Sequence, residues 1–153
     1  MKPHFLSAHR IQEIVQAVKC LQEGQAVDFK NHGAKGRKLE IRLDLADGNF
    51  ADIRLVVTAG IASDPKTYEA ALLISGPRVR GIGYSPTRQR KFYKNYIEKG
   101  WHENILDWAL PKSDLNHNRH VPLSDCQPSD LTRFLRYACE KWNIRLDFEK
   151  ELL

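Results

Sequence analysis

The amino-acid sequence predicts an α+β fold: a mainly antiparallel sheet of five or six strands, arranged as a meander, with an N-terminal and a C-terminal helix packed on one face. Apolar residues recur at helical spacing near both ends of the chain and alternate with polar residues through the middle. Asp47-Gly48 separates two alternating segments, as in a β-hairpin. The 153 residues, 42% of them hydrophobic, fit one domain covering residues 1–153.

Two segments have the spacing of amphipathic helices. The first helix is expected over residues 8–23, with Ser7 as its N-terminal cap and Gly24 at its end. The second begins near residues 128–130 and ends at Asn143. Their apolar stripes are Ile11, Ile14, Val15, Val18 and Leu21 in the first, and Leu131, Phe134, Leu135, Ala138 and Trp142 in the second. Such stripes pack a helix against the protein's own core.

Strands are expected between the helices and after the second one. The expected segments are 26–30, 38–45, 50–58, 68–75, 78–84 and 144–148. The segments 38–45 and 50–58 alternate between apolar and polar residues, which indicates one buried face and one solvent-exposed face. The segment 68–75 is apolar on both faces and therefore predicts a central strand.

The pattern changes after residue 84. Ser85 suits an N-terminal cap and Pro86 the first position of a helix over residues 87–99, which Gly100 would end. Residues 101–121 show weak periodicity, so they are expected to form the longest irregular stretch of the chain.

Positive charge is concentrated in residues 78–102. This stretch has seven lysines and arginines and one acid, so its net charge is 7 − 1 = +6, whereas the whole chain carries +5. Aromatic side chains are interleaved with these cations, and cations combined with flat rings suit phosphates and bases. Arg78 and Arg80 are expected on one face of their strand, leading into the basic helix. The residues expected to bind nucleic acid are Arg78, Arg80, Arg88, Arg90, Lys91, Tyr93, Lys94, Trp101 and Arg119.

Histidines follow the basic stretch. His102 and His120, with Arg88, are the candidate catalytic residues, because two imidazoles and an arginine suffice for metal-independent RNA cleavage. These residues and His117 are expected to converge on one surface. The alternative is a surface loop that contains histidines without catalysis. No metal is expected, because the histidine spacing matches no zinc signature, and no cofactor is expected, because nucleotide-binding motifs are missing.

The leading hypothesis is a small cytoplasmic protein that binds nucleic acid, RNA rather than DNA, through residues 78–102 with help from residues 112–120. In its catalytic version it is an endoribonuclease of toxin type; in its non-catalytic version it is a binding module. The alternative is a non-enzymatic interaction protein that docks on an acidic protein or a nucleoprotein, as an inhibitor or a component of defence or counter-defence. Enzymatic activity and oligomeric state stay open.

Cysteine content and hydropathy bear on the compartment. The cysteines Cys20, Cys126 and Cys139 are odd in number and widely spaced, so a disulfide framework is not expected and a reducing cytoplasm is. The sequence has no signal peptide pattern and no apolar run long enough to cross a bilayer, so no membrane partner is expected.

Overall fold

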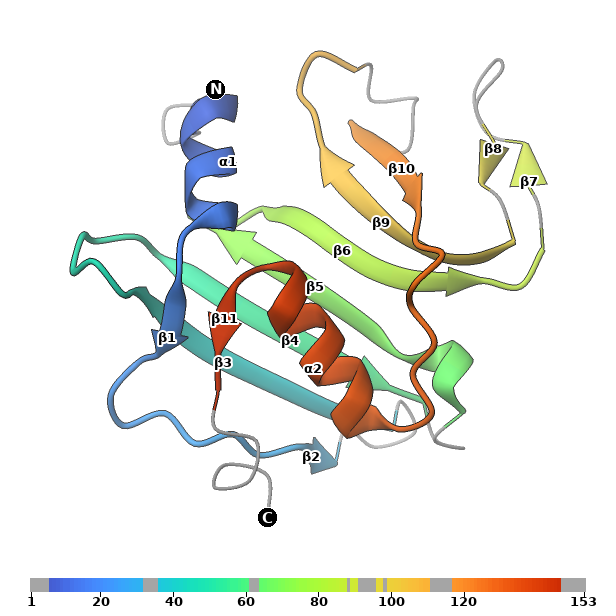
Figure 1. Cartoon of the computed structure of the whole chain (residues 1–153), viewed down its shortest axis with the longest axis horizontal. Coiled ribbons are helices and arrows are strands. Elements are labelled where there is room, and N and C mark those ends of the chain that lie inside the picture. Colours follow the sequence, from blue (N-terminus) through green and yellow to red (C-terminus); the bar gives the residue numbers. More distant parts are fainter. Residues whose placement is uncertain are drawn as a thin grey trace.

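The computed structural model describes residues 6–31, 36–60, 64–87, 89–90, 96–97, 99–110 and 117–146 (Figure 1). In chain order the elements are α1 (Ala8–Gln16), β1 (Lys19–Leu21), β2 (Lys30–Asn31), β3 (Arg37–Leu45), β4 (Ile53–Ala59), a short 3-10 helix (Pro65–Thr67), β5 (Glu69–Ile74), β6 (Arg78–Ser85), β7 (Gln89–Arg90), β8 (Tyr96–Ile97), β9 (Gly100–Leu106), β10 (Asn118–Pro122), α2 (Leu131–Lys141) and β11 (Ile144–Arg145). The fold is therefore α+β, as expected.

The main sheet has nine strands among the described residues. Strands β10, β9, β6, β5, β4, β3, β1 and β11 lie side by side in that order, and β2 pairs with β3. All these described pairs are antiparallel except β1 with β11, which is parallel. The sheet is mostly antiparallel, as predicted, but larger than the expected five or six strands. Strands β1, β9 and β10 account for much of the excess, because they replace a predicted helix end and a predicted loop.

The hairpin signal at Asp47-Gly48 is confirmed. Strands β3 and β4 pair antiparallel across it, with Leu43 opposite Ile53. Gly48 has φ +84° and donates its backbone N–H to the carbonyl oxygen of Leu45 at 3.1 Å. This positive φ is the conformation that glycine adopts without a steric penalty. Strand β5 lies between β4 and β6, as expected for a segment that is apolar on both faces.

The prediction of a first helix over residues 8–23 is wrong at its end. Ser7 caps the start, as expected, by accepting a hydrogen bond from the backbone N–H of Arg10 at 3.1 Å. However, α1 ends at Gln16 and Ala17 is already extended, with ψ 149°. The chain then enters β1, which pairs with both β3 and β11. Pairing on both edges of β1 overrides the local helical pattern.

The predicted helix over residues 87–99 is also wrong. Ser85 ends β6 instead of capping a helix, and β7 and β8 form a short antiparallel pair within this range. Pairing between β6 and β9 runs to Ser85 opposite Gly100, at the two ends of this range, whose residues 88, 91–95 and 98 lie outside the described residues. Aromatic residues favour strands as readily as they fit a helical stripe, which explains the error. The expected strand over residues 26–30 shortens to Lys30–Asn31.

The predicted irregular stretch over residues 101–121 contains two paired strands, β9 and β10. Their buried positions include Glu103 and Asn118, one in each strand, and both are polar. A strand with polar residues on its buried face lacks the apolar alternation that identifies strands in a sequence. Among the described residues, no helix is long and apolar enough to span a membrane.

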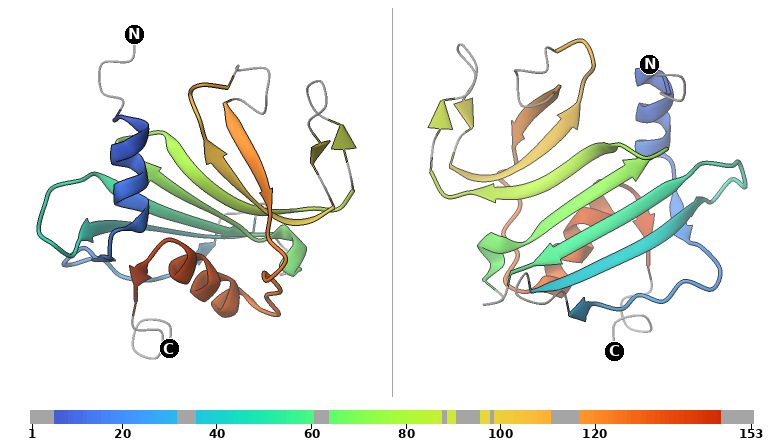
Figure 2. Two further views of the ribbon diagram at one scale, coloured as in Figure 1. Left: turned by 45° about the horizontal axis from the view of Figure 1, so that its top comes forward. Right: turned by 180° about the vertical axis from the view of Figure 1, so that it is seen from behind.

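The core lies between α2 and the face of the sheet that α2 covers. Figure 1 shows α2 across this face, and the right panel of Figure 2 shows the opposite face in front of α2. Buried side chains from the central strands and α2 fill the space between the two layers; they include Leu39, Ile41, Leu55, Leu72, Phe134 and Trp142. Asp130 caps α2 by accepting from the backbone N–H of Arg133 at 2.8 Å.

Candidate functional site

Strand β9 presents different residues to the two faces of the sheet, because side chains alternate along a strand. Glu103 lies on the core face, where its Oε2 accepts a hydrogen bond from Trp142 Nε1 at 2.8 Å. His102 and Asn104, its two neighbours, therefore lie on the opposite face, which we call the helix-free face because neither α1 nor α2 of the described residues covers it (Figure 2, right). This face is the candidate functional site.

The two predicted catalytic histidines contact each other on the helix-free face. The ring centroids of His102 and His120 are 4.0 Å apart, with 31° between the ring planes. They come from neighbouring strands. His120 of β10 pairs with Asn104 of β9, which is two residues after His102 and therefore on the same face. The Asn104 side chain orients His120, because its Oδ1 lies 3.1 Å from His120 Nδ1.

The environment of His102 keeps its imidazole neutral. The pKa of His102 is lowered to about 4, mainly by burial and also by the neighbouring His120 and Arg78, against a hydrogen bond to the backbone of Gly100 that raises it. The hydroxyl of Ser85 lies 3.3 Å from His102 Nδ1 and helps to orient the ring. A neutral imidazole of this kind can accept a proton from a bound molecule.

A cavity of about 200 Å³ opens beside His102 on this face. Gly81 and Gly83 of β6 form part of its lining, with Arg78 and Glu69 near them. A Cβ atom added at Gly83 would lie 3.8 Å from the His102 ring, and one added at Gly81 would lie 3.5 Å from the Arg78 side chain. The two glycines thus leave space next to the imidazole and the guanidinium that larger residues would occupy.

Arg78 and Arg80 do not share a face, contrary to the sequence-based expectation. The register between β5 and β6 shifts at this point, where Leu72 pairs with Arg80 and Leu73 with Arg78. Such a bulge places one extra residue, Val79, in β6 and re-aims the following side chain. Arg78 is exposed and lines the cavity beside His102, whereas Arg80 is buried on the core face.

Two further predicted nucleic-acid contacts also lie apart from the histidine pair. Arg119 precedes His120 on β10 and therefore points to the other face, where its Nε lies 3.5 Å from Asp107 Oδ2. The Trp101 ring packs on Phe134 of α2, with 5.4 Å between ring centroids, and edge-on to Tyr84. These two contacts pack the Trp101 indole against the hydrophobic core.

The side chains of the remaining residues predicted to bind nucleic acid are not described by the structure. Arg88, Lys91, Tyr93 and Lys94 lie outside the described residues, and of Arg90 the structure describes only the backbone, in β7.

His117 does not join the other two histidines. Its Nδ1 lies 2.6 Å from the carbonyl oxygen of Leu110, and its ring packs on Trp108 at the loop end of the β9–β10 hairpin. Of the three histidines expected to converge, His102 and His120 therefore lie together and His117 lies apart.

The sequence interpretation missed Ser85, Asn104 and Glu69 as members of this site. Asn104 could have been found from alternation with His102, had residues 100–106 been recognised as a strand. Ser85 and Glu69 had no signal in the sequence, because only the pairing of β5, β6 and β9 brings them near His102. Within the described residues, no group of three or more His, Cys, Asp or Glu side chains is arranged to hold a metal ion.

Comparisons of the chain with protein-family models, with curated proteins and with solved structures found no match.

Proposed function

We propose that the protein binds RNA on the helix-free face of β6, β9 and β10 and cleaves it by acid–base catalysis. The observation that supports this function is the contact between the His102 and His120 rings, whose centroids are 4.0 Å apart, beside a cavity that His102 and Arg78 line. A pair of imidazoles can take and give protons near neutral pH, and arginine binds phosphate. The three side chains therefore combine the groups that phosphodiester cleavage requires.

The proton balance of the pair assigns a role to each ring. Two imidazolium cations at this separation repel each other, so the pair holds one proton more readily than two. One neutral ring and one protonated ring are the combination that a general base and a general acid need. His102, which lines the cavity and whose lowered pKa keeps it neutral, is assigned as the base, and its ring neighbour His120 is assigned as the acid.

In the proposed reaction, His102 takes the proton of the ribose 2′-hydroxyl, and the 2′ oxygen attacks phosphorus. The bond between phosphorus and the 5′ oxygen breaks, and His120 gives its proton to that oxygen. The products are a 2′,3′-cyclic phosphate and a 5′-hydroxyl, so atoms and charge balance. Arg78 stabilises the negative charge that develops on the phosphate oxygens. A phosphate beside the His102 ring also raises the pKa of that ring, because it favours the charged imidazolium.

The sequence that connects β6 to β9 is rich in positive charge. Residues 86–99 contain five lysines and arginines and one glutamate, so their net charge is 5 − 1 = +4. Figure 1 shows β7 and β8, which lie within this segment, at the end of the sheet where β6 leads to β9. His102 comes soon after the start of β9 at Gly100. Concentrated positive charge attracts polyanions and raises their association rate.

The test is incubation of the protein with labelled RNA and with labelled DNA, each with and without EDTA, recording both binding and cleavage. The expected result is RNA cleavage that survives EDTA, yields cyclic phosphate ends and is lost in His102→Gln and in His120→Gln. Binding without cleavage would reduce the function to a nucleic-acid-binding module. Neither binding nor cleavage would refute the proposed function and favour docking on an acidic protein.

A matched pair of variants separates a specific site from net charge. Arg78→Gln removes a cation beside the histidines, and Arg42→Gln removes an exposed cation from β3, remote from the histidines in the sheet order. For single-stranded RNA, Arg78→Gln should make the slope of log K against log salt shallower by about 0.7, whereas Arg42→Gln should not change it. Equal effects would mean that net charge alone drives association.

A further inference from the structure

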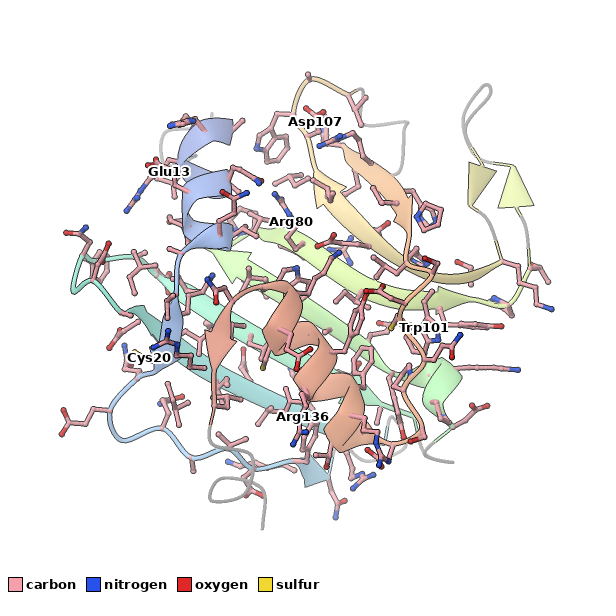
Figure 3. All side chains as sticks on the ribbon, viewed as in Figure 1. Glu13, Cys20, Arg80, Trp101, Asp107 and Arg136 are labelled. Atoms are coloured by element: carbon pink, nitrogen blue, oxygen red, sulfur yellow. The ribbon has the colours of Figure 1, made fainter. Side chains whose placement is uncertain are left out.

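A second cavity, of about 480 Å³, lies on the core-face side of β6 and β9, away from the histidine pair. Its walls come from α1, the start of β6, β9 and the end of α2, and Figure 3 labels Arg80 between α1 and β9. The lining includes Gln12, Arg80, Glu103, Ile105 and Lys141. Cavities of this size hold small molecules.

Arg80 brings a buried positive charge to this cavity. Only 6% of the residue is exposed, and burial lowers the pKa of its guanidinium, while the nearby Glu103 raises it. Nη1 donates to the carbonyl oxygen of Val79 at 2.8 Å, and Nη2 donates to Gln12 Oε1 at 2.7 Å. Both described acceptors are neutral. A buried cation bonded to neutral oxygens is stabilised further by an anion.

Glu103 brings a buried negative charge to the same cavity. The residue is 6% exposed, and its Oε2 accepts from Trp142 Nε1, which is a neutral donor. It lies diagonal to Arg80 across the β6–β9 pair, because Arg80 pairs with Ile105. Between these two described residues there is no ion pair within 4.0 Å. Each charge therefore keeps capacity for a group placed between them.

We propose that this cavity binds a small zwitterion of the α-amino acid class, with its carboxylate on Arg80 and its ammonium group on Glu103. Arginine forms paired hydrogen bonds with a carboxylate, and a carboxylate accepts well from an ammonium group. A simple anion would meet Glu103 and Glu140, and a simple cation would meet Arg80 and Lys141, so each would be partly repelled. A ligand with both charges on adjacent groups satisfies both. The site is independent of the proposed RNA cleavage.

The test is isothermal titration calorimetry of the whole chain with the standard amino acids, one at a time. At least one is expected to bind saturably. Its analogue without the amino group and its analogue without the carboxylate are expected to bind at least about tenfold more weakly, because each loses one charged hydrogen-bonding partner. No saturable binding by any amino acid would overturn the proposal, and so would equal affinity for the amino acid and both analogues.

A variant tests the placement of the ammonium group. Glu103→Gln removes the charge but keeps an oxygen that can accept from Trp142 Nε1, so the contact with α2 is retained. It should abolish the preference for the amino acid over the analogue without the amino group. Glu69→Gln, which removes one charge from the helix-free face, should keep that preference. An unchanged preference in Glu103→Gln, or an equal loss in Glu69→Gln, would refute the placement.

A second variant tests the other half of the site. Arg80→Lys keeps the positive charge but loses the forked donors, so affinity should fall mainly for ligands that carry a carboxylate. The affinities of Arg80→Lys test the proposed site even if Glu103→Gln does not fold. Unaltered affinity of Arg80→Lys for both the amino acid and the analogue without the amino group would exclude Arg80 as the carboxylate partner. Circular dichroism and thermal unfolding establish that each variant is folded before titration.

Discussion

Lowering the pH from 7 to 5 should destabilise the fold through His102. Its pKa is about 4 in the folded chain and 6.5 in the unfolded chain, so the neutral ring is favoured by folding. Between these values the unfolded state binds more protons, and stability falls as pH falls. From pH 6.5 to 5 one proton contributes up to about 2 kcal/mol, at about 1.4 kcal/mol per pH unit. Partial solvent exposure of the ring reduces this to about 1 kcal/mol.

The assay is urea unfolding of the wild type and of His102→Gln at both pH values. Glutamine can still hydrogen-bond Ser85 but does not titrate, so the variant should lose about 1 kcal/mol less than the wild type between pH 7 and 5. His9→Gln is the control, because the His9 side chain is 87% exposed. Equal losses of stability between pH 7 and 5 in His102→Gln and in the wild type would contradict this prediction, and so would a loss in His9→Gln as small as that in His102→Gln.

Three further substitutions test other contacts. His120→Gln should raise the pKa of His102, because a neighbour that lowers it is removed. An NMR titration of the His102 ring in the wild type and the variant measures this pKa. An unchanged value would show that the two rings do not affect each other's protonation. Lys19→Met should lower the free energy of unfolding by about 2–5 kcal/mol in urea titrations, since three carbonyl oxygens lose a charged donor. Asp130→Ala should lower it by about 1 kcal/mol through loss of the α2 cap, and an unchanged unfolding midpoint would contradict that.

The elements that the sequence predicted well are those whose local pattern agrees with their tertiary environment. In β3, Leu39, Ile41 and Leu43 are buried while Glu40 and Arg42 are exposed, so alternation along the chain reproduces the two faces of the sheet. α2 has a buried stripe at helical spacing and a side-chain cap at its start. In these segments, neighbours in sequence carry enough information to fix the structure.

The elements that were missed depend on partners that are distant in sequence. Lys19 lies within the helix predicted over residues 8–23 and outside its apolar stripe, yet it is 0% exposed. Its Nζ donates to the carbonyl oxygens of Val15, Ala17 and Trp142 at 2.6–2.8 Å, at the ends of both helices. Burial lowers its pKa to about 8, and three acceptors offset part of that cost. A local sequence pattern cannot predict the burial of this lysine, because its third acceptor, the carbonyl oxygen of Trp142, is 123 residues away.

The candidate site illustrates the same limit. His102 and His120 were singled out for their chemistry, and the structure brings them into ring contact. They converge because β9 and β10 pair. These strands were predicted as an irregular stretch, because the buried Glu103 and Asn118 interrupt the apolar alternation of a strand. Residue type therefore identified the histidines, whereas their geometry came from strand pairing that the sequence did not reveal.

The bulge in β6 changes what the positive charge of residues 78–102 means for any ligand. In a regular strand Arg78 and Arg80 would share a face and add their charges at one surface. The extra residue Val79 separates them, so Arg78 lies beside the histidines and Arg80 beside Glu103 on the opposite face. A phosphate bound at the histidine pair and a zwitterion bound in the second cavity would thus each meet one of these two arginines. Net charge summed along a stretch overstates the charge that one surface offers, and the register of a single pair of strands decides how it is divided.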